Sequence, residues 1–327
     1  MNDAIRAVML DPDWFGDVDA ERDHFRDLLD NVVVEAIDCQ EDEIPDRVGE
    51  ADLLLSHYTG VSAEVMDATG CQVVSRYATG IDGIDVDAAT ERGVRVTRVP
   101  TYCNDEVGTH IVSLAMALSR GLPMYDASTE DGTWEWDLAA PIHPPERQTF
   151  GFLAFGNKAQ AAAERARALG FDVASHDPYL SDDELEAKGA TPVSFEELLD
   201  ISDVLSLNTP LTDETEEMID ADALARLDDN AILINTSRGR VVDETALINA
   251  LEADELRGAG LDVLAREPPD PDNPLLSRDD VIATPHAAWY STGSEETLRR
   301  RGTEIAVAAL RGEEVDGLVN TDVLGEA

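Results

Sequence analysis

The chain has 327 residues, 43% of them hydrophobic, and this length and composition predict a folded protein with two domains. Its 69 acidic and 24 basic residues give a formal net charge of −45, the wrong sign for a nucleic-acid partner. No apolar run approaches the roughly 20 residues that span a bilayer, and the start does not resemble a secretion signal, so we expect a cytoplasmic protein without a membrane partner.

The acidic residues are spread along the whole chain, which argues for a folded protein with a carboxylate-covered surface. Such a surface suits a high-salt cytoplasm, because the Debye length at about 1 M salt is only about 3 Å. Lysine occurs only as Lys158 and Lys188. Cysteines occur in no metal-binding or disulfide pattern, which predicts buried free thiols and no metal site; they are Cys39, Cys71 and Cys103.

In residues 1–100, short apolar runs alternate with helix-like stretches. The runs predict buried strands over 5–10, 31–37, 51–58, 71–77 and 94–99. Helices are expected between some of them, over 20–30 and 62–69. This alternation is typical of a parallel, doubly wound sheet.

A second series of the same kind follows a long connection. Residues 105–120 are apolar on all sides and predict a buried helix, whereas 121–148 contain Pro and Trp and predict an irregular arm. Further strands are expected over 149–154, 171–175, 203–208, 230–236, 258–263 and 280–285, and a last helix over about 291–311. We therefore expect two doubly wound α/β domains, a discontinuous one over 1–103 plus 290–327 and a continuous one over 104–289.

The segment AFGNKA, residues 154–159, is a modified dinucleotide-binding turn. Glycines are usual at three of its positions, but here Ala154 and Ala159 flank a single Gly156. Gly156 keeps the position at which backbone approaches a pyrophosphate. Asp177 follows at the end of the next strand, 21 residues after Gly156. A carboxylate at this position accepts hydrogen bonds from the ribose hydroxyls and repels a 2′-phosphate. The turn fits NAD better than NADP; a turn that only packs strand against helix is the alternative.

Three later strands are each followed by a chemically active side chain. These side chains are Arg238, Glu267 and His286, and Asp262 also stands at a strand end. Taken singly, they fit a surface ion-pair residue, a helix-capping acid and a packing histidine. Ligands in open α/β sheets bind beyond the carboxyl ends of the strands, so their joint placement predicts a site.

Several motifs resemble the D-isomer-specific 2-hydroxyacid dehydrogenases over essentially the whole chain. They are VVSRYATGIDGIDVDAATERGVRVTRVP (73–100), YDASTEDGTWEWD (125–137), INTSRGRVVDETAL (234–247), LDVLAREP (261–268) and TPHAAWYS (284–291). Within this family, YCNDEV, HDPYLSD and PHAAWYS resemble the branch that contains the C-terminal-binding proteins, and phosphoglycerate dehydrogenase is the next closest relative.

The resemblance implies a Rossmann NAD-binding domain, with a dimerisation helix and arm over 105–148, and a flavodoxin-like substrate domain, with the active site in a cleft between them. It implies a homodimer that uses NAD on a small 2-keto or 2-hydroxy acid. The implied catalytic residues are Arg238, which grips the substrate carboxylate, His286, the acid/base, and Glu267, which orients the histidine.

The implied cofactor contacts are Phe155, Gly156, Asn157, Lys158, Asp177, Asn208, Thr209, Pro210, Thr236, Ser237, Arg238, Asp262, His286 and Ala288. The implied substrate contacts are Ala78, Thr79, Gly80, Arg238, His286 and Trp289, although Trp289 fits a hydrophobic core equally well. The other histidines match no catalytic position and are interpreted as structural or exposed; they are His24, His57, His110, His143 and His176.

Two functions remain open at this point. The first is an NAD-dependent dehydrogenase. The second is an NAD-sensing binding or scaffold protein of the C-terminal-binding-protein type, in which nucleotide sets the oligomeric state. A protein that only binds has little need of a histidine–glutamate pair, which favours the enzyme.

Overall fold

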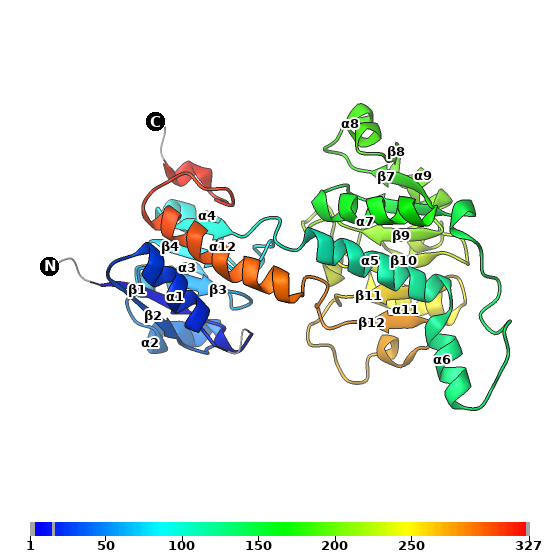
Figure 1. Cartoon of the computed structure of the whole chain (residues 1–327), viewed down its shortest axis with the longest axis horizontal. Coiled ribbons are helices and arrows are strands. Elements are labelled where there is room, and N and C mark those ends of the chain that lie inside the picture. Colours follow the sequence, from blue (N-terminus) through cyan, green and yellow to red (C-terminus); the bar gives the residue numbers. More distant parts are fainter. Residues whose placement is uncertain (1–3, 15–16, 325–327) are drawn as a thin grey trace. The chain divides into compact units, whose positions relative to one another are not determined.

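A computed structural model describes residues 4–14 and 17–324 of the chain. Its internal contacts divide the chain into two units. The first comprises the residues up to Tyr102 and those from Ser291 onward, and the second runs from Cys103 to Tyr290, so each break lies one residue from the expected boundary. Both units are α/β and each contains one parallel sheet, which confirms the expected fold class (Figure 1).

The first unit has a five-stranded parallel sheet in the order β2-β1-β3-β4-β5, the flavodoxin-like order of a doubly wound fold. Its strands are β1 (Ile5–Met9), β2 (Val32–Ala36), β3 (Leu53–Ser56), β4 (Val73–Arg76) and β5 (Arg95–Arg98). Its helices are α1 (Asp19–Leu28), α2 (Ile44–Arg47), α3 (Ala63–Thr69), α4 (Val86–Glu91) and α12 (Thr292–Leu310), with 3-10 turns at Pro12–Trp14, Glu41–Glu43 and Thr321–Leu324.

Helices cover this sheet in two groups. Residues of α2, α3 and α4, such as Ile44, Val65 and Ala89, share a buried core with Leu54 and Val74 of the sheet. Helices α1 and α12 pack against each other, and α12 lies over β4 and β5. The exposed edge of β5 is partly covered, because the segment after α12 hydrogen-bonds to it: Val319 N donates to Val96 O (2.8 Å).

The second unit has a seven-stranded parallel sheet in the order β12-β11-β10-β9-β6-β7-β8, a Rossmann order with one added strand. Its strands are β6 (Thr149–Leu153), β7 (Asp172–His176), β8 (Thr191–Pro192), β9 (Val204–Leu207), β10 (Ile232–Asn235), β11 (Gly258–Leu261) and β12 (Val281–Ala283). Its helices are α5 (Asn104–Ser119), α6 (Leu122–Glu130), α7 (Asn157–Leu169), α8 (Asp182–Ala187), α9 (Phe195–Ile201), α10 (Ala221–Leu224) and α11 (Glu244–Glu252), with 3-10 turns at Pro145–Arg147, Gly239–Val241 and Pro274–Ser277.

In this unit α5 and α7 pack tightly on each other: a Cβ at Gly108 of α5 would lie 2.8 Å from the backbone of α7. Helix α5 also contacts β10, β11 and β12. Leucines of α9, α10 and α11, such as Leu198, Leu224 and Leu247, form a separate buried core with Leu205 and Leu233 of the sheet. The sheet is therefore buried between helices, and the carboxyl ends of its parallel strands share one edge.

Three expectations for the second unit were wrong or incomplete. Residues 122–130 form helix α6 instead of an irregular segment, because Pro123 stands in the first helical turn, where proline is tolerated. Helix α5 is not apolar on all sides, since Asp105, Thr109 and Ser113 form an exposed polar stripe at helical spacing. Strand β8 was missed because it has only two residues, one of them Pro192.

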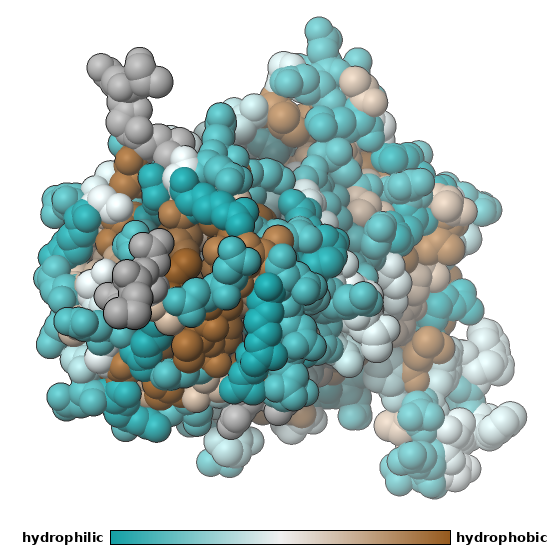
Figure 2. All heavy atoms as spheres, turned by 60° about the vertical axis from the view of Figure 1, so that its left-hand side comes forward, coloured by the Kyte–Doolittle hydropathy of each residue, from teal (hydrophilic) through white to brown (hydrophobic). Residues whose placement is uncertain are grey.

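Hydrophilic side chains cover much of the face shown in Figure 2, with apolar atoms visible between them. With 69 acidic and 24 basic residues, one-to-one pairing with lysine or arginine can reach fewer than half of the acids. Mobile cations must therefore screen much of the repulsion between carboxylates.

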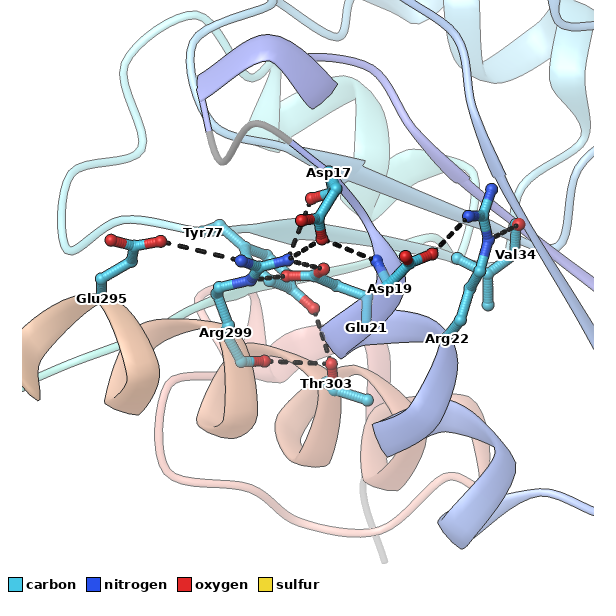
Figure 3. A network of polar contacts seen from close by, with 9 residues as sticks. All are labelled: Asp17, Asp19, Glu21, Arg22, Val34, Tyr77, Glu295, Arg299 and Thr303. Atoms are coloured by element: carbon cyan, nitrogen blue, oxygen red, sulfur yellow. Dashed lines mark hydrogen bonds and ion pairs between the residues drawn. The ribbon is translucent and has the colours of Figure 1, made fainter. Parts of the chain in front are cut away.

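A buried ion pair joins α12 to α1 in the first unit (Figure 3). Glu21 of α1 is fully buried, and its two oxygens accept hydrogen bonds from Nε (2.8 Å) and Nη2 (2.7 Å) of Arg299 on α12. Arg299 also donates to the carbonyl oxygen of Asp17 (2.9 Å). The hydrogen bonds that Arg299 donates to Glu21 raise the pKa of Arg299, so the guanidinium stays charged.

Tyr77, just after β4, lies beside this pair. A Cβ at position 302 of α12 would lie 2.7 Å from its ring, so Gly302 is needed to accommodate the tyrosine. The Thr303 hydroxyl donates to the Arg299 carbonyl (3.0 Å), which leaves its oxygen to accept from the Tyr77 hydroxyl (2.9 Å). Burial raises the pKa of Tyr77, so it remains a neutral donor. Together these contacts fix α12 on the first unit.

Glu21→Gln tests this anchor. We expect it to lower the free energy of unfolding by about 3 kcal/mol, because it removes the fully buried counter-charge of Arg299. The other carboxylate partners of Arg299, Asp17 and Glu295, are more exposed and more distant. Urea denaturation followed by circular dichroism measures the change. The matched control is Asp19→Asn on the same helix, whose ion pair with Arg22 is exposed and worth at most about 1 kcal/mol. Equal, small losses in the two variants would contradict the role of Glu21.

Candidate active site

The turn between β6 and α7 is strained at its first position, where the fingerprint usually has glycine. Ala154, not Gly156, adopts a left-handed backbone conformation, with φ of 66°, whereas Gly156 has φ of −69°. A Cβ at Gly156 would contact nothing within 4 Å, so its glycine leaves open space in front of the turn and is not needed for φ. Ala159, in the first turn of α7, is fully buried. The turn thus keeps the approach position of a dinucleotide site and stores strain at its first alanine.

Asp177 holds this turn in place. Its Oδ2 accepts a hydrogen bond from the Phe155 backbone N–H (2.8 Å), and its Oδ1 accepts one from Tyr179 N–H (2.9 Å). The Ala154 N–H donates to the His176 carbonyl (2.8 Å). A carboxylate oxygen can accept more than one hydrogen bond, so Asp177 can bind a hydroxyl and still fix the turn.

Both lysines of the chain belong to the same region. Lys158 lies in the first turn of α7, which carries no acidic residue there. Lys188 follows α8, and its Nζ approaches Gln160 Oε1 (3.4 Å), while Gln160 donates to the Phe155 carbonyl (2.7 Å). A helix N-terminus flanked by lysine attracts anions, which is notable in a chain this acidic.

The loop after β9 contains a buried polar group. Thr209 is 8% exposed, and its hydroxyl has no hydrogen-bond partner among the described residues. Its neighbour Asn208 donates from Nδ2 to the Ser206 carbonyl (3.0 Å). An unsatisfied buried hydroxyl is costly, so this one points to a ligand or a water molecule at the loop.

The turn after β10 is organised by Asn235, a residue that the sequence interpretation missed. Asn235 is 1% exposed; its Oδ1 accepts from Ser237 N–H (3.0 Å) and Ser237 Oγ (2.9 Å), and its Nδ2 donates to the Arg238 carbonyl (3.0 Å). An asparagine that ends a buried strand ahead of Thr-Ser is the signal that could have identified it. It sets the backbone on which Thr236, Ser237 and Arg238 stand.

Gly239 brings this turn against the next loop. A Cβ at this position would lie 1.9 Å from the backbone carbon of Leu264, so only glycine fits. The segment after Leu264 leads to Glu267, whose Oε1 accepts from Leu264 N–H (3.2 Å). The loops that carry Arg238 and Glu267 are therefore in direct backbone contact.

His286 and Glu267 are hydrogen-bonded, with Nδ1 of the histidine 2.7 Å from Oε2 of the glutamate. The histidine has a left-handed backbone, with φ of 53°, a conformation that is uncommon outside glycine. The backbone N–H of His286 donates to the Asp262 carbonyl (2.8 Å). The structure thus brings together two of the three expected catalytic residues and holds one in a strained conformation.

Asp262 supports this conformation. It is 2% exposed, and its Oδ1 accepts from Ala287 N–H (2.8 Å) and Thr284 Oγ1 (2.6 Å), while Oδ2 accepts from Ala288 N–H (2.9 Å). The Thr284 hydroxyl donates its hydrogen to Asp262, so its oxygen accepts a hydrogen bond from His110 Nε2 (3.0 Å). His110 therefore has a structural role.

The structure also describes the remaining expected positions, each within its own unit. Trp289 is half-buried and meets the Tyr290 ring edge-on, at 5.6 Å between centroids. Ala78, Thr79 and Gly80 follow β4 in the first unit, where Val99 N–H donates to the Ala78 carbonyl (2.9 Å). Cys39, Cys71 and Cys103 are buried, and none of these three thiols is part of a disulfide. Within residues 4–14 and 17–324, no three His, Cys, Asp or Glu side chains are grouped to hold a metal, and no helix there is long and apolar enough to cross a membrane.

The family model for the D-isomer specific 2-hydroxyacid dehydrogenase NAD-binding domain matches residues 112–288. The chain belongs to this family. Over 300 residues it is 36% identical to a glyoxylate reductase of Korarchaeum cryptofilum, covering 88% of this chain and 90% of the relative. It is also 36% identical to a D-3-phosphoglycerate dehydrogenase of Archaeoglobus fulgidus, covering 82% of this chain but 51% of that longer protein.

Solved structures of dehydrogenases have the same fold. The D-lactate dehydrogenase of Aquifex aeolicus, complexed with NAD and lactic acid, matches with a TM-score of 0.82 and 27% identity, covering 94% of this chain and 96% of that one. The resemblance to the family is thereby confirmed.

The residues of this family member fit a dinucleotide. The open space at Gly156 and the unsatisfied Thr209 hydroxyl lie on loops that follow strands of the sheet, and Lys158 lies in the first turn of α7. Asp177 stands at the end of the strand next to β6. A pyrophosphate at the turn and a ribose at the carboxylate would use these features.

The strain at Ala154 gives a stability test. We expect Ala154→Gly to raise the free energy of unfolding by up to about 1 kcal/mol, because relief of the left-handed strain exceeds the added chain entropy. The control is Ala168→Gly in α7, where the same change should lower stability by about 0.5–1 kcal/mol. Urea denaturation of both variants measures the difference, and a loss in both would contradict strain at the turn.

Proposed function

We propose that this protein is an NAD-dependent D-2-hydroxyacid dehydrogenase that interconverts a 2-keto acid and a D-2-hydroxy acid. The observation that carries the proposal is the His286–Glu267 hydrogen bond of 2.7 Å, in the unit that also holds the dinucleotide turn. A titratable pair beyond the strand ends of a nucleotide-binding sheet is suited to move a proton beside a bound cofactor.

In this proposal Arg238 binds the carboxylate of the substrate through a two-point fork, which lysine cannot reproduce. The backbone N–H groups of Ala78, Thr79 and Gly80, in the first unit, are proposed to bind the same carboxylate. Trp289 is proposed to form a wall of the substrate pocket.

His286 is proposed to exchange the proton with the C2 oxygen through Nε2, because Nδ1 is engaged by Glu267. The glutamate is proposed to fix the tautomer and the orientation of the imidazole ring. NAD, when bound, supplies or accepts the hydride at C2. The protein orients the reactants and handles the proton.

The proposed cofactor contacts are the residues expected from the family resemblance. Asn157 and Lys158 would hold the pyrophosphate, and Asp177 the adenosine ribose, with Thr209 and Thr236 on neighbouring loops. The negative charge of Asp177 disfavours the 2′-phosphate of NADP, so NAD is the proposed cofactor. Asp262 already accepts three hydrogen bonds, so we propose that it acts on the cofactor mainly through the loop that it supports.

The alternative is an NAD-sensing scaffold of the C-terminal-binding-protein branch, with little turnover. The motif PHAAWYS, which resembles that branch, supports this alternative. The histidine–glutamate pair favours the enzyme, because a protein that only binds does not need it.

We further propose a homodimer in a high-salt cytoplasm. Trp134 and Trp136, on the arm after α6, are 89% and 86% exposed, and a second copy of the chain could bury them. Arg257 holds this arm through the carbonyls of Ala139 (2.8 Å) and Pro141 (2.6 Å). Molar salt screens the repulsion that comes with a net charge of −45, so activity should be assayed in molar salt.

His286→Ala tests the catalytic assignment. We expect kcat to fall by about 10²–10⁴-fold, with NADH still bound, because only the proton donor is lost. Steady-state rates with a panel of 2-keto acids and NADH fluorescence titrations measure the two effects. The control is His143→Ala, an exposed histidine outside the site, which should leave both unchanged. Full turnover by His286→Ala would remove this residue from the mechanism.

A further inference from the structure

Three aromatic side chains of the first unit form a cluster, here called the aromatic rim: Trp14, His57 and Tyr58. The ring centroids of Trp14 and Tyr58 are 4.3 Å apart at an interplanar angle of 32°, and His57 meets Tyr58 edge-on at 4.6 Å. Trp14 lies 5.6 Å from His57 and is 52% exposed. The rim is thus a cluster of packed aromatic rings in which the indole is half exposed to solvent.

A buried carboxylate holds the loop that carries the rim. Asp11, after β1, is 7% exposed and accepts hydrogen bonds from three successive backbone N–H groups, those of His57 (2.7 Å), Tyr58 (3.2 Å) and Thr59 (2.9 Å). Three donors on one buried carboxylate fix the loop firmly, so the rim is a preformed feature of the fold.

A buried guanidinium joins this loop to the next one. Arg76 is 6% exposed; its Nη1 donates to Ser56 Oγ (2.7 Å) and to the Thr59 carbonyl (3.1 Å), and its Nη2 donates to the Asp82 carbonyl (2.9 Å). Three hydrogen bonds from Arg76 therefore join the loops after β3 and β4.

The rim adjoins the backbone proposed to bind the substrate carboxylate. His57 Nδ1 lies 2.5 Å from the carbonyl oxygen of Tyr77, the residue directly before Ala78–Gly80. In a 2-keto acid, the side chain is attached to C2, the carbon next to the carboxylate. A substrate whose carboxylate binds at Ala78–Gly80 therefore has its side chain within reach of the rim.

The chemistry of the two loops disfavours an anionic side chain. Residues 56–60 and 77–82 contain no lysine or arginine, so a second phosphate or carboxylate on the substrate has no counter-charge from them. The exposed indole offers apolar area and an aromatic face instead.

We infer that the preferred substrate is a 2-keto acid with a large apolar or aromatic side chain, and that Trp14 and Tyr58 are specificity-determining residues. This inference rests on the proposed dehydrogenase function. It separates this chain from an enzyme for glyoxylate or for a phosphorylated substrate.

The test is a comparison of kcat/KM for phenylpyruvate, pyruvate, glyoxylate and 3-phosphohydroxypyruvate with NADH in molar salt. We expect phenylpyruvate to exceed the other three by about 10-fold or more, a ratio typical of a filled apolar pocket. Trp14→Ala should lower kcat/KM for phenylpyruvate about 10-fold and that for pyruvate less than about 3-fold. Trp14→Phe should restore most of the loss. Val33→Ala, which removes an exposed apolar side chain of the first unit outside the rim, should leave the ratio unchanged.

The outcomes separate the two proposals. Equal loss for phenylpyruvate and pyruvate in Trp14→Ala, or preference for glyoxylate or 3-phosphohydroxypyruvate in the unchanged protein, would overturn the substrate class and leave the dehydrogenase intact. Absence of turnover with every 2-keto acid, in a protein that still binds NADH, would instead overturn the proposed function on which the inference rests.

Discussion

The candidate site depends on the buried carboxylate of Asp262 at the end of β11. A carboxylate that is 2% exposed must be compensated by hydrogen bonds, and this one takes them from Ala287, Ala288 and Thr284. Those bonds define the loop in which His286 adopts its left-handed backbone and meets Glu267. Without the Asp262 carboxylate the loop would lose these three hydrogen bonds. The position of the His286 imidazole therefore depends on this buried charge.

Carboxylates that accept hydrogen bonds from the backbone of another loop also occur at two other strand ends. Asp11 after β1 collects the N–H groups of residues 57–59, and Asp177 after β7 collects those of Phe155 and Tyr179. Each acid ties its own strand to a loop, and each loop is one that we assign to substrate or cofactor. In a chain with net charge −45, a few carboxylates thus act inside the fold as acceptors, whereas most of the others remain a surface charge for salt to screen.

Much of this architecture could be predicted because buried parallel strands are continuous apolar runs. The positions of Arg238, Glu267 and His286 beyond strand ends followed from the same reading. The partners of the acids could not be predicted, since Asp11 and residue 57 are far apart in sequence and meet only through the strand order. A tight turn at Ala154 followed from the fingerprint, whose first glycine makes that turn, whereas the left-handed φ of an alanine there became known only from the structure. Helix α6 was missed because proline was taken as a breaker, although the first helical turn accepts it.

The most direct measurement follows the hydride. NADH deuterated at C4 of the nicotinamide is incubated with the protein and a mixture of 2-keto acids in molar salt, and the products are analysed by mass spectrometry and chiral chromatography. The account predicts a D-2-hydroxy acid that carries the deuterium at C2. NADH that binds but keeps its label, with no 2-hydroxy acid formed from any member of the mixture, would contradict it and leave the nucleotide-sensing alternative.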